Sequence, residues 1–347
     1  MLTVIFGAGA SFDSDPSYPP GQSRDESIRL PLANQLFADR PIFSQALRQF
    51  PECHEIIPYL RTRRDNMSVE QVLENLQGEA QHHPVRHKQL AAVRYYLQLM
   101  LRNCEHSWTN VTGNITSNYR TLLDQIEQWR PGYQQVCLVT FNYDTLLDTA
   151  FQQVGIKITT MSDYVSEKNY KLIKVHGSLN WAREVLSPID NLATRNSGNV
   201  VHELINRAAS LGISDNYHII TDCPVGLLPA QNPIPILPAL AIPVQKKHAF
   251  ECPPDHLEQL RGCLSQTTKL LVIGWQGVES HFVELLRTIP SGTPGLVVAG
   301  GKANAQEVVD RLGRDVMGVN WTSADGGFTD FVVKRTADKF LRYTDLR

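Results

Sequence analysis

The stretch LTVIFGAGAS at residues 2–11 decides the fold of this chain. The apolar run Leu2 to Phe6 predicts a buried strand that turns through two closely spaced glycines into a helix. A turn of this kind presents backbone N–H groups that can bind a pyrophosphate. Phe12 replaces the third glycine of the G-x-G-x-x-G pattern, so a tight structural turn remains the alternative.

Strand and helix patterns alternate further along the chain. Apolar segments that predict strands lie at residues 136–140, 171–175, 217–221, 269–273 and 296–299. The later strands alternate with predicted amphipathic helices at residues 255–265, 279–288 and 305–312. Short apolar strands between helices indicate a parallel sheet that is covered on both faces. We therefore predict an α/β fold with a Rossmann-like, doubly wound parallel sheet.

Two regions depart from this alternation. Residues 32–132 carry helical spacing, as in 69–77 and 89–101, and predict a helical insertion within one domain that spans residues 1–347. Residues 224–254 contain eight prolines. Because proline lacks a backbone N–H, we expect this stretch to form neither a central strand nor a helix, and to pack across the sheet edge.

Composition narrows the class of protein. Hydrophobic residues make up 42% of the chain and charged residues 20%, and the formal net charge is −2. This balance predicts a globular protein without direct nucleic-acid binding. Since no apolar run approaches the roughly 20 residues of a membrane helix and no secretion signal is evident, we expect a cytoplasmic protein. The six cysteines form no C-x-x-C pair, which argues against a disulfide framework and a zinc site.

Two polar motifs follow predicted strands. TFNYD at residues 140–144 ends the strand that begins at Val136, and HGSLNW at 176–181 follows the strand that ends at Val175. A doubly wound sheet binds ligands at the carboxyl ends of its strands, so both motifs are expected at the ligand edge. The alternatives are local: Asn142 or Asp144 could cap the next helix, and a histidine there is often satisfied by a backbone carbonyl.

Together, the motifs GAGAS at 7–11, FNYD at 141–144 and KVHGSLNW at 174–181 resemble the three signatures of the sirtuin-like superfamily. The Asn-Tyr-Asp and His-Gly-Ser-x-Asn-Trp forms more closely resemble the bacterial branch in anti-phage defence, whose members hydrolyse NAD. The likeness runs from residue 1 to about residue 300, with the helical insertion unmatched to classical sirtuins. It implies an NAD+ glycohydrolase that releases nicotinamide and ADP-ribose and depletes NAD during infection.

The resemblance also implies roles for single residues. Asn142 would position the ribose or the attacking water, His176 would be the general base, and Asp144 would contact the nicotinamide amide. The residues implied to bind NAD are Gly7, Ala8, Gly9, Ser11, Asp144, Gly177 and Gly274. Cleavage of the glycosidic bond passes through an oxocarbenium-like state. Because the pyridinium leaves easily, the reaction needs an oriented water and a near-neutral base rather than a strong acid.

Gly177 has two interpretations beside His176. A glycine at this point allows the close approach of either a ligand or another backbone segment. Gly274 introduces a departure, because Trp275 follows it where the family usually shows a small hydroxyl residue. The contacts to the adenosine half of NAD therefore stay open.

Metal sites are not predicted. Zinc-binding cysteine pairs of deacylating sirtuins have no counterpart in the chain, which disfavours deacylation. His83 and His87 have the i, i+4 spacing that can share a metal, and His82 lies beside them. Pro84 interrupts the helix and no further ligand completes the site, so a solvated surface is the favoured interpretation.

Other functions also fit the motifs, and the proposed activity predicts partners. A non-catalytic subunit that senses NAD or ADP-ribose is the second candidate, and a protein deacylase or ADP-ribosyltransferase is less favoured. Because NAD loss is toxic, we expect activity to depend on a homo-oligomer or a partner. The resemblance implies one such partner, a hexameric translocase ATPase that pairs with a compact subunit of this kind.

Overall fold

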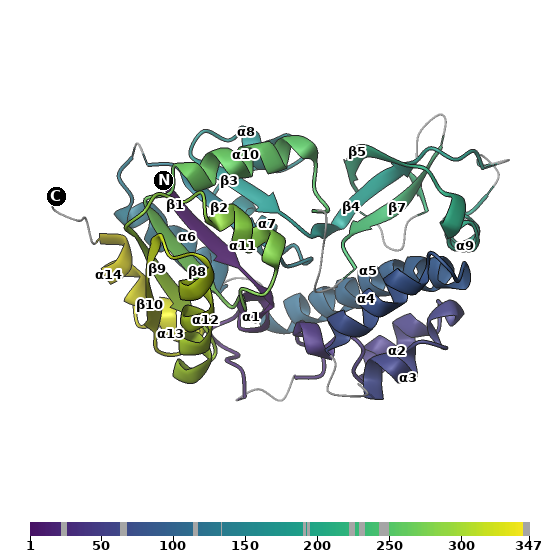
Figure 1. Cartoon of the computed structure of the whole chain (residues 1–347), viewed down its shortest axis with the longest axis horizontal. Coiled ribbons are helices and arrows are strands. Elements are labelled where there is room, and N and C mark those ends of the chain that lie inside the picture. The colour runs from purple at the N-terminus through teal and green to yellow at the C-terminus, as the bar shows by residue number, and fades with distance from the viewer. Residues whose placement is uncertain are drawn as a thin grey trace. The chain divides into compact units, whose positions relative to one another are not determined.

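The first predicted strand lies in the middle of a parallel sheet in the computed structural model (Figure 1). β1 (Leu2–Phe6) pairs on one side with β2 (Val136–Thr140) and on the other with β8 (Lys269–Ile273). All five residues of β1 and of β2 are buried, which explains their unbroken apolar pattern. The structure describes residues 1–21, 26–62, 68–113, 117–132, 134–189, 192, 195–221, 226–228, 233–242 and 250–342.

In the described chain the sheet has six parallel strands in the order β10-β9-β8-β1-β2-β3. The remaining strands are β3 (Tyr170–Lys174), β9 (Thr293–Val298) and β10 (Val319–Ala324). The chain moves outward from β1 in one direction through β2 and β3, and in the other through β8, β9 and β10. This is the strand order of the doubly wound dinucleotide-binding fold, and it confirms the predicted α/β class.

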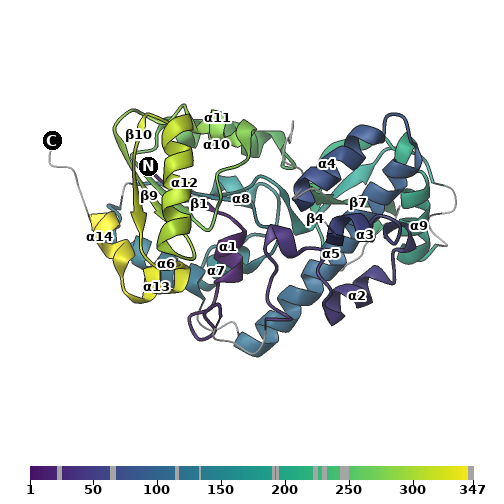
Figure 2. The same ribbon diagram turned by 60° about the horizontal axis from the view of Figure 1, so that its bottom comes forward.

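Helices flank this sheet in two groups (Figures 1 and 2). α6 contacts α7, α13 and α14, whereas α10 contacts α8 and α11, and α11 contacts α12. Their bounds are α6 (Asn118–Trp129), α7 (Leu146–Gln153), α8 (Asp163–Ser166), α10 (Pro254–Ser265), α11 (Ser280–Leu286), α12 (Lys302–Asp315), α13 (Phe328–Val333) and α14 (Thr336–Arg342). Right-handed crossovers that leave β1 in opposite directions place their helices on opposite faces.

The contacts within the chain divide it into two compact units. The first unit consists of Met1–Glu26, Trp108–Val175 and Pro254–Arg347, and it contains the six-stranded sheet. The second unit consists of Ser27–Ser107 and His176–Pro253.

The second unit combines helices with an antiparallel sheet. Its helices are α2 (Pro41–Leu47), α3 (Ile57–Thr62), α4 (Val69–Glu79), α9 (Ser197–Asn206) and the part of α5 (Val85–Thr112) up to Ser107. Its strands are β4 (Gly177–Val185), β5 (Ile213–Ile219), β6 (Leu227–Leu228) and β7 (Ile234–Leu240), in the order β5-β4-β7-β6. The helices predicted at 69–77 and 89–101 are confirmed within α4 and α5.

Two sequence-based expectations about this sheet were wrong. The segment predicted as a strand at 217–221 lies at β5, an antiparallel strand of the second unit rather than part of the parallel sheet. The proline-rich stretch contains β7, which pairs on both sides although it includes Pro235 and Pro238.

The ladder accommodates both prolines. The register of β4 against β7 shifts just before Ala182, the residue opposite Pro238, and a bulge of this kind tolerates a missing donor. Pro235 faces the two-residue β6, close to the sheet edge. Ile236 between them is fully buried with Ala182, so the strand still contributes to a core. Within residues 224–254, positions 224–225, 229–232 and 243–249 lie outside the described residues.

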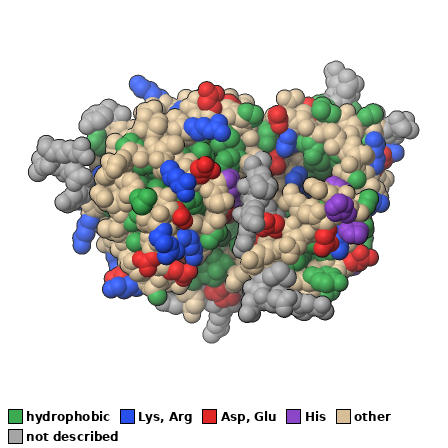
Figure 3. Space-filling view, viewed as in Figure 1, with side chains coloured by type: hydrophobic (Ala, Val, Ile, Leu, Met, Phe, Trp, Pro, Cys, Tyr) green, Lys and Arg blue, Asp and Glu red, His purple; other side chains and the backbone are tan. Residues whose placement is uncertain are grey.

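Charged side chains of both signs lie on the surface (Figure 3), and the described cysteines are buried. On the face shown in Figure 3, basic and acidic side chains are interspersed. Among the described helices, none combines the length and apolar character needed to cross a membrane. Five cysteines are buried free thiols, namely Cys53, Cys104, Cys137, Cys252 and Cys263, and Cys223 lies outside the described residues.

Candidate functional site

The strand order reverses between β1 and β8: β2 and β3 lie on one side of β1, and β8, β9 and β10 lie on the other. Open α/β sheets bind ligands at such a point, beside the carboxyl ends of the strands. Three of the predicted motifs end strands here: Gly7 follows β1, Asn142 follows β2 and Gly274 follows β8. The first unit thus brings the predicted residues Gly7, Ala8, Gly9, Ser11, Asn142, Asp144 and Gly274 to one edge of its sheet.

The glycines at this edge pack against one another. A Cβ added to Gly7 would lie 2.5 Å from the Cα of Trp275, and one added to Gly9 would lie 2.9 Å from the Cα of Gly274. Gly274 has a φ of +65°, and its Cβ would lie 2.3 Å from the backbone N of Ala10. Each position therefore requires glycine because the backbone after β8 touches the turn after β1.

This packing uses two of the N–H groups expected to bind phosphate. The N–H of Gly7 donates to the carbonyl of Ile273 and that of Gly9 to the carbonyl of Gly274, both at 3.0 Å. Ala8 is the first residue of the short helix α1 (Ala8–Phe12), and no acceptor in the described chain is paired with its N–H. The structural interpretation of the turn thus accounts for both glycines, and Ala8 is the residue of the turn that keeps a donor available.

Asn142 is held by its side-chain nitrogen. Nδ2 donates to the carbonyl of Gly7 at 2.9 Å and to Oγ of Ser11 at 2.8 Å, and lies 3.2 Å from the hydroxyl of Tyr119. Because a carbonyl can only accept, the contact with Gly7 fixes which end of the amide is nitrogen. Asn142 is 6% exposed, and no donor among the described residues reaches its Oδ1. The oxygen can therefore accept a hydrogen bond from a ligand or water.

Tyr119 is a site residue that the sequence did not predict. It comes from α6 and is buried, with its ring edge-on to Phe6 at 5.2 Å and to Phe328 at 5.4 Å. Its hydroxyl lies 2.9 Å from Oγ of Ser11, and burial raises its pKa well above the ordinary value. Helical spacing alone presents this residue as a core aromatic, and only the packing of α6 reveals the contact with Asn142.

Asp144 serves the helix that follows it and also carries a costly charge. Its Oδ1 accepts the N–H of Leu146, the first residue of α7, at 3.2 Å, which makes an Asx turn before the helix. The N-cap of α7 is Thr145, so Asp144 itself does not cap this helix. The side chain is buried, and this burial raises its pKa above 3.8. The cation of Lys174 and a hydrogen bond from Ser11 oppose the rise. Asp144 is thus a buried carboxylate at the ligand edge whose ionised form is only partly compensated.

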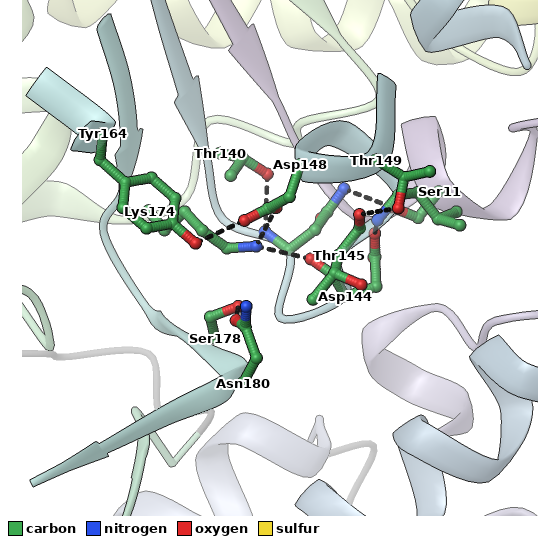
Figure 4. Close-up of polar contacts among 12 residues, drawn as sticks. Ser11, Thr140, Asp144, Thr145, Asp148, Thr149, Tyr164, Lys174, Ser178 and Asn180 are labelled. Atoms are coloured by element: carbon green, nitrogen blue, oxygen red, sulfur yellow. Dashed lines mark hydrogen bonds and ion pairs between the residues drawn. The ribbon is translucent and has the colours of Figure 1, made fainter. Parts of the chain in front are cut away.

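A buried ion pair lies next to Asp144 (Figure 4). Nζ of Lys174 donates to the backbone carbonyl of Asp144 at 2.6 Å and to Oδ2 of Asp148 at 2.7 Å. The hydroxyl of Tyr164 donates to Oδ1 of the same Asp148 at 2.5 Å. The sequence showed Lys174 as part of a motif but gave no sign of its partners, because Asp148 lies on α7 and Tyr164 on α8.

Aromatic side chains pack behind the turn. Phe141 stacks on Trp275 with ring centroids 4.9 Å apart and an interplanar angle of 11°, and Phe282 meets both rings edge-on. Nε1 of Trp275 donates to Glu279 at 2.7 Å. All three rings are buried, which fits the role of packing anchors.

His176 and Gly177 belong to the second unit, whose second segment begins directly after Val175. His176 is buried and its carbonyl accepts the N–H of Ala241 at 2.9 Å. Gly177 has a φ of +78°, and a Cβ there would lie 1.8 Å from the carbonyl oxygen of Ala239. The close approach expected at Gly177 is therefore made by the backbone of β7.

The histidines weighed as metal ligands lie at the start of α5. His82 and His83 are exposed and precede the helix, which begins at Val85, whereas His87 lies within it. Within the residues that the structure describes, no group of three or more His, Cys, Asp or Glu side chains is arranged to hold a metal ion.

Comparison with known proteins gives a match to a family model and alignments with solved structures. Residues 136–206 match a family model described as "SIR2-like domain". A solved structure described as "The Structural basis of Sirtuin Substrate Affinity" aligns with 13% identity and a TM-score of 0.38, over 97% of this chain and 93% of its own. No curated protein sequence matches the chain. The segment that contains Asn142, Asp144, His176 and Gly177 is thus similar to a SIR2-like domain.

Proposed function

We propose that this chain is an NAD+ glycohydrolase that cleaves NAD to nicotinamide and ADP-ribose. One observation carries the proposal: the segment similar to a SIR2-like domain supplies Asn142 and Asp144 at the point where the doubly wound sheet reverses its strand order. That edge is where such sheets bind dinucleotides. The buried, partly compensated carboxylate of Asp144 supports a binding role, since perturbed groups of this kind cluster at functional sites.

The roles in this proposal combine the available atoms of Asn142 and Asp144 with the motif resemblance, which supports His176 as the base. Oδ1 of Asn142 accepts a hydrogen bond from the attacking water, while its nitrogen stays bound to Gly7 and Ser11. The carboxylate of Asp144 accepts from the amide of nicotinamide. His176 is the general base, because an imidazole titrates near neutral pH and can remove the proton of the water as the C–N bond breaks. The positive pyridinium leaves as neutral nicotinamide, so a strong acid is unnecessary.

The rest of NAD lies along the same edge in this proposal. The N–H of Ala8 donates to the pyrophosphate, and Ser11 lies in the same short helix α1. Gly300 and Gly301 follow β9, the neighbour of β8, and a Cβ at either would meet no described atom within 4 Å. This open backbone supports room for the adenosine half.

Chromatography of NAD incubated with the purified chain tests the proposal. We expect nicotinamide and ADP-ribose in equal amounts, and loss of both in Asn142→Ala and in His176→Ala. Lys171→Met is the matched control, since Lys171 lies on β3 and donates to the carbonyl of Val165 rather than to any site residue. Full activity of His176→Ala would remove the base from the mechanism.

The same samples separate hydrolysis from sensing. Calorimetric titration with NAD and with ADP-ribose measures binding directly. Tight binding without product, both for the chain alone and with its partner, would favour the non-catalytic sensing subunit. Absence of both binding and product would contradict either function. An acetyl-lysine peptide assay tests the less favoured deacylase.

We further propose that NAD hydrolysis serves anti-phage defence in the cytoplasm. The support is the motif resemblance, and the toxicity of NAD loss argues for control by assembly. In this proposal the active form is a homo-oligomer or a complex with a hexameric translocase ATPase. Cellular NAD measured after phage infection should fall in cells with the wild-type chain and stay constant with Asn142→Ala. Sedimentation of a fully active monomer would contradict control by assembly.

A further inference from the structure

Lys174 opens the KVHGSLNW motif, but the proposed chemistry assigns it no role. It is the last residue of β3, and its side chain is completely buried. A buried ammonium is costly unless it is paired and hydrogen-bonded. Replacing such a pair by apolar residues is often neutral for stability, so stability alone does not explain why the chain keeps this pair.

The contacts of Lys174 point to the loop between β2 and α7. Its Nζ lies 2.6 Å from the carbonyl oxygen of Asp144, and 2.7 Å from Oδ2 of Asp148 in the first turn of α7. Tyr164 donates to the other oxygen of Asp148 at 2.5 Å. Figure 4 shows this chain of contacts running from Tyr164 through Asp148 and Lys174 to Asp144. Tyr164 therefore holds Asp148, and Asp148 in turn holds the Lys174 ammonium that binds the Asp144 carbonyl.

Several charged and polar groups face the carboxyl of Asp144. Lys174 approaches from β3, Ser11 from α1, Tyr119 from α6 and Asp148 from α7. Burial raises the pKa of Asp144, and of the groups that act against burial Lys174 has the largest effect. Asp148 acts in the opposite direction, and more weakly. Lys174 is thus both the mechanical anchor of this loop and the cation that favours the ionised carboxylate.

We propose that Lys174 is a positioning residue of the site: its ammonium, oriented by Asp148 and Tyr164, holds the Asp144 carbonyl and so keeps the Asp144 carboxylate in place for the nicotinamide amide. The step to nicotinamide rests on the proposed function. The hold of Lys174 on Asp144 does not, because it is a property of the chain without substrate. An experiment can therefore address the two parts separately.

The test compares Lys174→Met with the double variant Lys174→Met/Asp148→Leu in the full chain. The single variant leaves the Asp148 carboxylate buried without its cation and can fail to fold, whereas the double variant removes both charges. Lys171→Met is the matched control, since Lys171 lies on the same strand and donates to the carbonyl of Val165. Circular dichroism and hydrogen exchange establish which variants are folded.

The first measurement is a carbon-13 NMR titration of the Asp144 carboxyl, assigned by its loss in Asp144→Asn. In the double variant the pKa of Asp144 should rise, because the lost attraction of Lys174 outweighs the weaker repulsion of Asp148 that is lost with it. Lys171→Met should leave the titration close to that of the wild type, since it keeps the Lys174 ammonium together with Asp148 and Tyr164. An unchanged Asp144 titration in a folded double variant would overturn the inference, whatever the activity.

The second measurement is nicotinamide release as a function of pH. With the loop displaced, kcat/KM should fall about tenfold to a hundredfold, and the acid limb of the profile should move to higher pH. A proportional loss at every pH, with the limb unmoved, would show a merely structural role and overturn the positioning role. If the wild-type chain releases no nicotinamide, the proposed function fails while the titration still decides whether Lys174 controls Asp144.

Discussion

Asp144 in the first unit and Glu184 in the second are both carboxylates with polar partners, yet their surroundings shift their pKa values in opposite directions. Hydrogen bonds from Asn216 and His218, at 3.0 and 2.7 Å, hold the pKa of Glu184 below its ordinary value. Burial raises the pKa of Asp144 in spite of the nearby cation of Lys174. One carboxylate is stabilised by its surroundings as a charge, and the other is kept at a cost.

The difference indicates which of the two carboxylates is ionised at an energetic cost. Glu184 joins β4 to β5 and behaves as part of a structural network. Asp144 lies at the ligand edge of a doubly wound sheet. There, an amide donor on a ligand would add hydrogen bonds that stabilise the ionised carboxylate. Each of the following predictions compares a residue of the ligand edge with a counterpart in the second unit.

The largest effects are expected at the two glycines with positive φ that touch a neighbouring backbone, one in each unit. Gly177→Ala and Gly274→Ala should each lower the free energy of unfolding by about 4 kcal/mol, since strain at φ adds to a collision with backbone. The control is Gly155→Ala, where φ is +88° but no described atom lies within 4 Å of the added Cβ. Urea unfolding of the three variants measures the difference.

Strain alone should cost Gly155→Ala about 1–2 kcal/mol. A Gly274→Ala variant no less stable than Gly155→Ala would show that the turn after β1 can retreat from β8. The close packing of the ligand edge would then be a weaker constraint than that of Gly177 against β7.

The next effect concerns one cation from each unit. Lys174→Met should cost about 3 kcal/mol, because Asp148 is left buried without its partner. Arg183→Met should cost about 1 kcal/mol, since the guanidinium is 19% exposed and one of its two carboxylate partners, Asp215, is 76% exposed. Unfolding in urea at low and high salt checks both values. Equal costs would contradict the claim that breaking the buried Lys174 pair costs more than breaking the partly exposed Arg183 pairs.

The sequence predicted the central strands to the residue. β1, β2 and β8 begin and end where the apolar runs do, because strands buried on both faces need no polar alternation. β10 was missed since it lies at the edge of the sheet, where its pattern mixes buried Val319 and Ala324 with exposed residues. β7 was missed because proline content is a local signal, whereas its pairing with β4 depends on residues far away in the chain.

The candidate site was predictable only as far as parallel strands gather their carboxyl ends. That rule brought Gly7, Asn142 and Asp144 together without a structure. It could not show that Gly9 packs on Gly274, because their contact depends on the strand order. The remaining hydrogen-bond partners come from helices whose positions depend on tertiary packing. Tyr119 on α6 is one of them.

Two tyrosines, buried Tyr119 and half-buried Tyr217, give a smaller contrast. The hydroxyl of Tyr119 reaches Asn142, whereas that of Tyr217 donates to Glu251 at 3.1 Å in the second unit. Tyr119→Phe and Tyr217→Phe should each cost about 1 kcal/mol of stability, the usual value of one hydrogen bond. Only Tyr119→Phe should lower kcat/KM for nicotinamide release, by about tenfold, since Asn142 loses one of three acceptors. Equal activity of the two variants would contradict a role for Tyr119 in holding Asn142.

The smallest effect is the dependence of stability on pH, and it reverses sign between the two carboxylates. The folded pKa of Asp144 lies above its ordinary value of 3.8, so the folded chain binds this proton more tightly than the unfolded chain. Its contribution to stability therefore falls as the pH rises from 3.8 through the folded pKa. The folded pKa of Glu184 lies below 4.5, so its contribution is present above 4.5 and is lost as the pH falls through the folded pKa.

Asp144→Asn and Glu184→Gln convert these signs into a measurement. Asparagine keeps an oxygen for the N–H of Leu146, so the variant isolates the charge. Compared with the wild type, Asp144→Asn should gain stability as the pH rises to 7, and Glu184→Gln should lose it. Urea midpoints across the pH series report both slopes. Parallel slopes would mean that Asp144 is as well compensated as Glu184, and the unfavourable charge that supports a ligand at the edge of the sheet would not exist.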